Sequence, residues 1–457
     1  MIESKFLDIK NAFYAFFQKK LEKLTQNSLI LSKIDEIILF FISLILVSST
    51  FFESEKIAVF AIAAILLTVV KLFTKSGAKV RLTGWDAAIF VYFVICFIST
   101  INSTLLPQSI HGFLKTVIYI IYYYCAANYF QTNQNKIKYV FVLVGILCSA
   151  EALIALYQNF AGVEQISTWQ DSNYINPEDA IARAYGTLKP YNPNLLGGYL
   201  LAGIPYLAGA AAIFLVKKNY KLFMTGCVLF LICSLAVFVT GSRGAYLGLG
   251  AILAGLVLVG WLILKTDFSH QEKLKTLYKK AVTAMAGLIV LVLIAVPKIT
   301  KRLLSIFLLR GDSSTSFRMN VYHSSWQMFC DNWFFGIGAG NQTFREIYGL
   351  YMLTGFDALS TYSVPLEIAV EAGIFALIAF VLFLVLFLTD SFKFLLKNDT
   401  NDLTGKVIVS AAILVILGVM THGMFDTIFF RPQVQFLFWT VLAMSSAVLI
   451  EKNTKEA

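Results

Sequence analysis

Long, predominantly apolar runs recur along most of the 457-residue chain, and many reach 18 residues or more. A helix of that length crosses a hydrocarbon core about 30 Å thick. The composition agrees, because 58% of the residues are hydrophobic, only 14% are charged and the mean hydropathy is +0.73. The runs are continuously apolar, without the alternation typical of membrane strands. The sequence therefore predicts an all-α integral membrane protein.

The apolar runs predict about twelve transmembrane helices. They fall near residues 35–53, 57–74, 85–102, 112–130, 138–160, 194–216, 221–240, 244–264, 281–297, 363–389, 407–422 and 433–450. We therefore expect five regions in chain order: an N-terminal segment at 1–34, spans one to nine within 35–297, a loop at 298–362, spans ten to twelve within 363–450, and a tail at 451–457.

Lysine and arginine are unevenly divided between the two sides of this arrangement. Of the 37 basic residues, 25 lie in the termini and in the loops that share their side, and 12 lie elsewhere. The side with more basic residues is expected to be cytoplasmic, which places both termini there. The net charge of +10 then reflects membrane orientation, so no nucleic-acid partner is expected. The N-terminal segment carries Phe6, Phe13, Phe16 and Phe17 and is expected on the cytoplasmic membrane surface.

Two longer loops, 161–193 and 298–362, are expected on the outward side. The second contains two patterns typical of amphipathic helices at a membrane interface. On "RMNVYHSSWQMFCDNW" the apolar face would consist of Met319, Tyr322, Trp326 and Phe329. On "NQTFREIYGLYM" it would consist of Phe344, Ile347, Tyr348 and Tyr351.

An arginine in an apolar setting points to an anion site. Arg243 lies in "VFVTGSRGAYLGLG", at the expected outward turn between the seventh and eighth spans, with Ser242 before it. A guanidinium keeps its charge when partly dehydrated and binds phosphate oxygens in a bidentate fork. The alternative is an arginine that extends to lipid headgroups. Arg183, Lys189 and Asn194 are expected on the same side and would extend such a site.

Acidic and histidine side chains in apolar stretches add candidates for proton transfer. Glu367 and Glu371 lie one turn apart near the outer end of the tenth span, and either a structural ion pair or a general base fits them. Glu151 in the fifth span has the same alternatives. A second group around the last outward turn consists of His422, Asp426 and Arg431. His422 and Asp426 are four residues apart, so on a helix they would face together as a base and its orienting carboxylate. His323 in the long loop is a further candidate. Neither histidine nor cysteine shows metal-ligand spacing, and no nucleotide-binding loop is present, so no metal or cofactor is expected.

The chain resembles the O-antigen ligase and polymerase superfamily of membrane glycan-transfer proteins. The matching stretches are "NPNLLGGYL", "GSRGAYLGL", "SFRMNVYHSSWQMFCDNWFFGIGAGN" and "YSVPLEIAVEAGIFAL". Within the superfamily it looks closest to a cyanobacterial-type branch described as bicarbonate transporters, on the segments "STYSVPLEIAVEAG" and "HGMFDTIFFRPQVQ".

The resemblance implies an outward cavity in which arginines hold the diphosphate of a lipid-linked glycan. Arg243 and Arg318 match the arginine positions, and Asn194 matches the asparagine of the family motif. The family's histidine, which activates the acceptor hydroxyl, is absent, and Tyr362 stands at its place. Another base would then be His323, Glu367 or His422.

Two functions follow as hypotheses. The first is a glycosyltransferase of the bacterial inner membrane, a ligase or polymerase. It would move a glycan from an undecaprenyl-diphosphate-type carrier to an acceptor hydroxyl at the periplasmic face, with membrane lipids as further partners. The arginines would stabilise the leaving diphosphate. The second is a transporter of a small anion such as bicarbonate. It is less favoured, because the basic candidates gather on one face and no broken helix at the midplane is apparent.

Overall fold

The computed structural model describes residues 11–21, 28–52, 54–75, 82–162, 183–297, 300 and 313–456. Within these ranges the chain is helical and contains no strand, which confirms the predicted fold class. The α-helices are α2 (Leu29–Ser32), α3 (Ile34–Ser48), α4 (Ser54–Thr74), α5 (Gly84–Asn102), α6 (Leu106–Thr132), α7 (Ile137–Ala161), α8 (Pro193–Val216), α9 (Tyr220–Val239), α10 (Arg243–Asp267), α11 (Glu272–Ala295), α13 (Ser313–Asp331), α14 (Asn341–Tyr348), α15 (Val364–Leu395), α16 (Leu403–Gly423) and α17 (Pro432–Glu456). Short 3-10 helices are η1 (Gln134–Lys136), η3 (Thr400–Asp402) and η4 (Ile428–Phe430).

Each of the twelve predicted spans coincides with a helix. Ten helices in the described part of the chain are long and apolar enough to cross a membrane. The other two are α3 and α6. With 15 residues, α3 is about 22 Å long and shorter than the hydrocarbon core. Polar and aromatic residues dilute the apolar character of α6.

Several helices extend beyond the predicted boundaries. The 32-residue α15 continues past residue 389 and is kinked at Gly373, where φ is +80°. The predicted tail at 451–457 is helical as far as Glu456, because α17 continues through it. Hydropathy alone does not detect such extensions, because a helix can continue beyond the apolar run into polar residues. Phe6 and most of the loop 161–193 lie outside the described residues.

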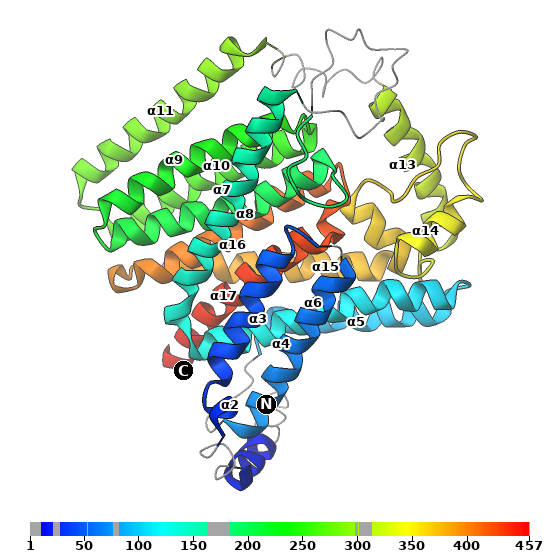
Figure 1. Cartoon of the computed structure of the whole chain (residues 1–457), viewed down its shortest axis with the longest axis horizontal. Coiled ribbons are helices and arrows are strands. Elements are labelled where there is room, and N and C mark those ends of the chain that lie inside the picture. The colour runs from blue at the N-terminus through cyan, green and yellow to red at the C-terminus, as the bar shows by residue number, and fades with distance from the viewer. Residues whose placement is uncertain are drawn as a thin grey trace.

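The centre of the bundle is α17. Every residue from 432 to 450 on this helix is buried, and it packs against α6, α8 and α16. The opposite extreme is α11, which has no buried residue and lies at the margin beside α10 (Figure 1). Bulky apolar side chains on the outer faces of α5, α9 and α15 are exposed, as expected where lipid replaces a protein neighbour.

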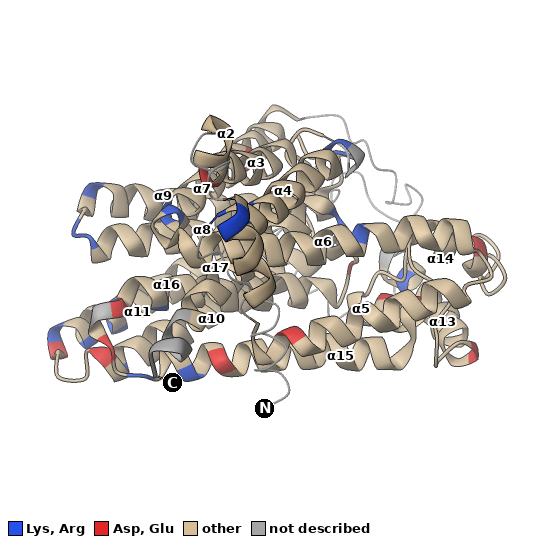
Figure 2. Cartoon of the chain, turned by 90° about the horizontal axis from the view of Figure 1, so that it is seen from below, with Lys and Arg blue, Asp and Glu red and all other residues tan. Residues whose placement is uncertain are grey.

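Charged residues lie mainly at the ends of the long helices, and the ribbon between them carries few (Figure 2). At the end remote from α13 and α14, buried lysines are matched by carboxylates. Lys406 forms an ion pair with Asp267, and both side chains are almost completely buried. Lys71 is 2.9 Å from a carboxylate oxygen of Asp35. These pairs lie between helix ends and hold them together.

The two helices of the long loop, α13 and α14, are present as predicted. They share a small core with α15, and its buried members include Val321, Met328, Phe344, Tyr348 and Val370. The predicted apolar face of α14 is confirmed. On the predicted apolar face of α13, Met319 and Trp326 are more than half exposed, so this face does not pack fully on the protein. Its place at the membrane interface stays a prediction. The side of α13 that packs carries Val321 and Met328 instead, because α15 approaches from that direction.

The glycine-rich segment 336–340 joins this outer unit to the kink in α15. The amides of Ile337 and Gly338 donate to the carbonyl oxygens of Val370 and Glu371, each at 3.0 Å. The amide of Ile374 donates to Trp333 at 2.9 Å on the other side of the kink. A Cβ atom at Gly373 would collide with the Phe334 carbonyl oxygen. The kink therefore exposes backbone groups of α15 that fix the segment in place.

Candidate functional site

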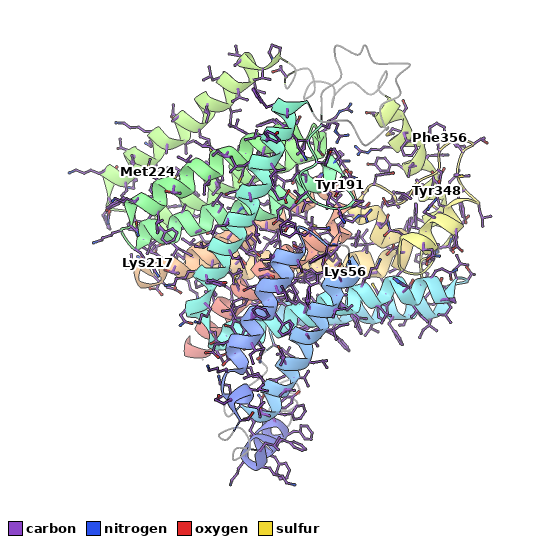
Figure 3. The ribbon with its side chains drawn as sticks, in the orientation of Figure 1. Lys56, Tyr191, Lys217, Met224, Tyr348 and Phe356 are labelled. Atoms are coloured by element: carbon purple, nitrogen blue, oxygen red, sulfur yellow. The ribbon has the colours of Figure 1, made fainter. Side chains whose placement is uncertain are left out.

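A cavity of about 990 Å³ opens at the end of the bundle that carries α13 and α14. Its wall is formed by α6, α13, α15 and α17 together with residues 190–194, 355–362 and 426–432. Tyr191, Tyr348 and Phe356 lie on this side of the molecule, and Lys217 and Met224 lie at the opposite side (Figure 3). The volume is within the range of pockets that bind small molecules and cofactors.

The cavity brings together most of the predicted site residues. Those that line it are Arg183, Asn194, Arg318, Tyr362, Glu367, Glu371, Asp426 and Arg431. Those that do not line it are Lys189, Ser242, Arg243, His323 and His422.

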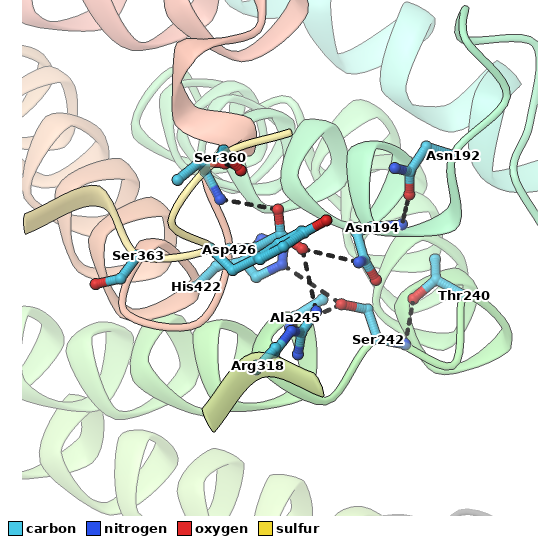
Figure 4. A network of polar contacts seen from close by, with 12 residues as sticks. Asn192, Asn194, Thr240, Ser242, Ala245, Arg318, Ser360, Ser363, His422 and Asp426 are labelled. Carbon is cyan, nitrogen blue, oxygen red and sulfur yellow. Dashed lines mark hydrogen bonds and ion pairs between the residues drawn. The ribbon is translucent and has the colours of Figure 1, made fainter. Parts of the chain in front are cut away.

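A continuous polar network occupies one wall of the cavity (Figure 4). Asp426 accepts hydrogen bonds from the Asn194 side-chain amide at 2.8 Å and from its neighbour's amide, Thr427 N, at 2.8 Å. It also forms an ion pair with Arg318 at 3.4 Å. The Asn194 side-chain oxygen accepts from Arg183 Nη2 at 2.6 Å. Two guanidinium groups are thus joined through an amide and a carboxylate.

Local structure explains where Asn194 and Arg183 lie. Asn192 is the N-cap of α8 and accepts from the Asn194 amide at 2.8 Å, and Pro193 begins the helix. Arg183 Nε donates to the Thr240 carbonyl oxygen at 2.9 Å. Gly241 has φ +63°, and Arg183 side-chain atoms lie 3.1–3.4 Å from where its Cβ would be. The Arg183 side chain therefore packs against the glycine turn before α10, where a larger residue would leave it little room.

The segment after Arg183 is held by two polar side chains of α7. Glu151 accepts hydrogen bonds from the amide, at 2.9 Å, and the hydroxyl of Thr187. Gln158 accepts from Gly186 N at 2.8 Å and donates to Gly186 O at 3.0 Å. Glu151 therefore binds this turn, and it forms no ion pair with an arginine among the described residues. Its role in the structure is to position the turn.

Arg243 lies at the predicted turn, as the first residue of α10, but its side chain does not line the cavity. Ser242 is the N-cap of this helix and accepts from Ala245 N at 3.4 Å. Arg243 Nη1 donates to the hydroxyl of Thr315 on α13 at 2.9 Å. Arg318 lies on the same helix, one turn further along. Arg243 therefore fixes the part of α13 that carries a cavity arginine.

Neither predicted histidine reaches the cavity. His422 is buried, and its Nε2 is 3.4 Å from the Ser242 hydroxyl. No hydrogen bond between His422 and Asp426 occurs among the described residues, because α16 ends at Gly423 and the expected four-residue helical spacing is lost. His323 is exposed on α13, 3.2 Å from the Gln327 side chain.

Two carboxyl groups from α15 do face the cavity. Glu367 accepts from Thr361 N at 2.7 Å, and Glu371 accepts from Gly340 N at 2.9 Å. Neither forms an ion pair with any residue that the structure describes. Each carboxylate has a backbone hydrogen bond and a place in the cavity wall, one turn apart as predicted.

Tyr362, at the position of the family's histidine, is unsuited to accept a proton. Its ring lies beneath the Arg318 guanidinium, with 5.7 Å between the guanidinium carbon and the ring centroid. Burial, together with the nearby Asp426 carboxylate, raises the pKa of Tyr362 to about 12. A phenol with that pKa stays protonated at neutral pH and acts as a hydrogen-bond donor.

One cavity cation was missed by the sequence analysis. Lys115 lines the cavity from α6. It lies within the predicted span 112–130, where a charged residue is rare enough to indicate a functional position. Lys189, which was predicted, is exposed outside the cavity; only its carbonyl oxygen is used, by the Gln433 side chain at 3.0 Å.

The cavity wall is suited to an anion with polar attachments. Four cations, Lys115, Arg183, Arg318 and Arg431, and three carboxyl groups line it. The described residues contain no group of three or more histidine, cysteine or acidic side chains that could hold a metal ion. Binding of phosphate oxygens by guanidinium groups and proton transfer to a carboxylate are the chemistry that these groups support.

Part of the chain matches a known protein family. Residues 228–381 match the family model described as O-Antigen ligase. The matched range runs from α9 to the first half of α15 and includes α13, α14 and the glycine-rich segment. It supports the O-antigen ligase and polymerase superfamily and a glycosyltransferase-like enzyme. It ends before "HGMFDTIFFRPQVQ", one of the two segments behind the resemblance to the bicarbonate-transporter branch, and that branch is not confirmed. No curated protein matches the chain.

Proposed function

We propose that the protein is an O-antigen ligase-like glycosyltransferase of the bacterial inner membrane. It moves a glycan from an undecaprenyl-diphosphate-type carrier to an acceptor hydroxyl, and the cavity opens to the periplasm. The observation that carries the proposal is the joint presence of Arg183 and Arg318 in one cavity of about 990 Å³, beside the segment that matches the ligase family.

Arg183 and Arg318 are the groups that bind the carrier diphosphate. They lie on one polar network, separated by Asn194 and Asp426. Negative charge on the diphosphate grows as the bond from the sugar's anomeric carbon to the phosphate oxygen breaks. Cations already fixed in position stabilise that charge without reorganising. Arg243 acts indirectly, by holding α13 through Thr315.

Glu367 is the proposed base. The acceptor hydroxyl oxygen attacks the anomeric carbon, its proton passes to the Glu367 carboxylate, and the carrier diphosphate leaves. Glu367 lines the cavity and follows Tyr362, whose ring lies under Arg318. It is therefore on the side of the cavity where the diphosphate binds. His323 and His422 lie outside the cavity lining.

Exposed aromatic rings next to α13 and α15 fit a substrate that enters the cavity from the membrane. The exposed aromatic side chains of Trp333 and Phe334 adjoin Phe375 on the outer face of α15, and Phe335 packs against Phe334. Aromatic rings are favoured at the boundary between lipid and water. A carrier whose lipid tail stays in the bilayer can thus present its diphosphate to a cavity at the same level.

The test is the replacement of the two arginines in the native host. Arg183→Gln and Arg318→Gln should each cause carrier-linked glycan to accumulate and the mature surface glycan to decrease. Arg345→Gln is the matched control, because Arg345 is exposed on α14 and paired with Asp357 outside the cavity lining. Unchanged glycans together with impaired bicarbonate uptake would overturn the proposal in favour of anion transport.

A further inference from the structure

Two cations of the cavity have no acidic partner. Lys115 and Arg431 both line the cavity, and both are exposed. Neither forms an ion pair with any residue that the structure describes. Arg318, by comparison, is paired with Asp426. The positive charge of Lys115 and Arg431 is therefore available to a ligand.

The two cations belong to one wall. Lys115 and Tyr119 are four residues apart on α6, so they lie on the same face of that helix. Arg431 directly precedes α17, whose Phe436 ring packs against the Tyr119 ring with 5.2 Å between the ring centroids. Helices α6 and α17 pack along one another. We call Lys115, Tyr119 and Arg431 the α6/α17 wall.

Electrostatics favour an anion at this wall. Two like charges that line one cavity repel each other, and an anion between them removes that repulsion. Arg431 also stands at the N-terminus of the 25-residue α17, where the helix dipole adds to the attraction. Glu371 lines the same cavity as Lys115, but its carboxylate accepts a hydrogen bond from Gly340 N and forms no ion pair among the described residues.

This wall is separate from the network that we assign to the diphosphate. That network joins Arg183, Asn194, Asp426 and Arg318, and none of its hydrogen bonds involves α6. Beside the α6/α17 wall lie Gln435 and Trp439, which also line the cavity. Both side chains are buried, and the Trp439 indole N–H donates to the Gln435 side-chain oxygen, so they support the wall as part of the packed bundle.

We propose that the α6/α17 wall binds a negatively charged group on the acceptor, so that the acceptor is an acidic glycan or phosphorylated sugar. This inference rests on the proposed function, because it assigns the second substrate of the same cavity. An acceptor bound there would place its hydroxyl near Glu367 and Glu371, between the two cationic groups of the cavity.

Binding to the purified full-length protein in lipid nanodiscs tests the assignment. Farnesyl diphosphate serves as the probe for the donor subsite. With that subsite saturated, glucose 6-phosphate, glucuronate and neutral glucose serve as probes for the acceptor subsite. The variants are Lys115→Gln with Arg431→Gln, Lys115→Arg with Arg431→Lys, and Arg183→Gln. Lys217→Gln is the control, an exposed lysine at the opposite end, and thermal unfolding of each variant checks folding.

We expect both acidic sugars to bind more tightly than glucose. The paired glutamine substitutions should weaken that binding about tenfold or more while leaving farnesyl diphosphate binding nearly unchanged. The arginine–lysine exchange should retain binding, and Arg183→Gln should weaken farnesyl diphosphate instead. Equal binding of glucose and the acidic sugars, or a loss of farnesyl diphosphate binding in the paired glutamine variant, would overturn the inference. Failure of the unaltered protein to bind farnesyl diphosphate would instead count against the proposed function.

Discussion

The two ends of the bundle differ in whether their cationic side chains are paired with carboxylates. At the end remote from α13 and α14, Lys406 is paired with Asp267, and Lys71 is paired with Asp35. At the cavity end, Lys115 and Arg431 have no such partner among the described residues. Arg318 is intermediate, with a partly exposed side chain 3.4 Å from Asp426.

The difference separates charges that hold the fold from charges that are available to a ligand. A cation that is removed from water needs an opposite charge and hydrogen bonds, or its burial is strongly unfavourable. Lys406 has both, because it also donates to the carbonyl oxygens of Leu395 and Lys397. Cations at an open cavity stay hydrated and need no partner until a ligand displaces the water. A lack of pairing at the cavity end is therefore informative about function.

The largest effect is expected at the paired end. Lys406→Met should lower the free energy of unfolding by about 3–5 kcal/mol, because Asp267 then remains buried without its partner. Unfolding by sodium dodecyl sulfate in mixed micelles measures this. The matched control is Lys393→Met, because Lys393 is exposed and its pair with Asp390 should contribute less than about 1 kcal/mol. Equal stability of the two variants would show that the buried pair does not hold the fold, and the proposed difference between the two ends would fail.

At the cavity end the expected effect is on rate and not on stability. Arg318→Gln should reduce glycan transfer about 10²- to 10³-fold, the loss typical for removal of one fixed donor at a site of developing negative charge. Arg345→Gln should change the rate little. The measurement is transfer from a lipid-diphosphate-linked glycan in proteoliposomes. A large fall in unfolding free energy for Arg318→Gln, with transfer per folded molecule unchanged, would assign Arg318 to the structural group.

A smaller effect is expected at Glu151, a buried acid that binds the turn after Arg183 without lining the cavity. Glu151→Ala leaves the amide and hydroxyl of Thr187 without their partner, which should cost about 1–3 kcal/mol. The turn that follows Arg183 loosens, so the KM for the donor should rise more than kcat falls. Glu151→Gln should restore most of both values. Leu153→Ala, on the exposed face of the same helix, is the control, and a similar rise in KM there would contradict the assignment.

The smallest effect is expected at Tyr362. Because its pKa is raised to about 12, the phenol is protonated at every pH at which the enzyme would be tested. Tyr362→Phe should therefore leave the pH dependence of transfer unchanged between about pH 6 and 9. It should also lack the roughly 10²- to 10⁴-fold loss that follows removal of a general base. A rate that rises with pH in the unaltered protein but not in this variant, together with a 10²-fold or greater loss, would show that Tyr362 is the base.

The sequence predicted the parts of the site that depend on local structure. Arg243 at the turn before the eighth span, and the carboxyl pair Glu367 and Glu371 one turn apart, follow from spacing and helix geometry. The side of α13 that packs on α15 was not predicted, because periodicity shows that a helix has two faces but not which one a neighbour will cover. The His422 and Asp426 pair failed because the helix ends between them.

By itself, the sequence determined the membrane helices and the side of the bundle at which the candidate residues would gather. Long apolar runs form helices in lipid because backbone groups have no other hydrogen-bond partners there. The tertiary structure alone decided which charged side chains face a common cavity. It brought Lys115 together with Arg431 and left Arg243 outside the cavity lining. Side-chain direction depends on how helices far apart in the chain pack, and no local pattern records that packing.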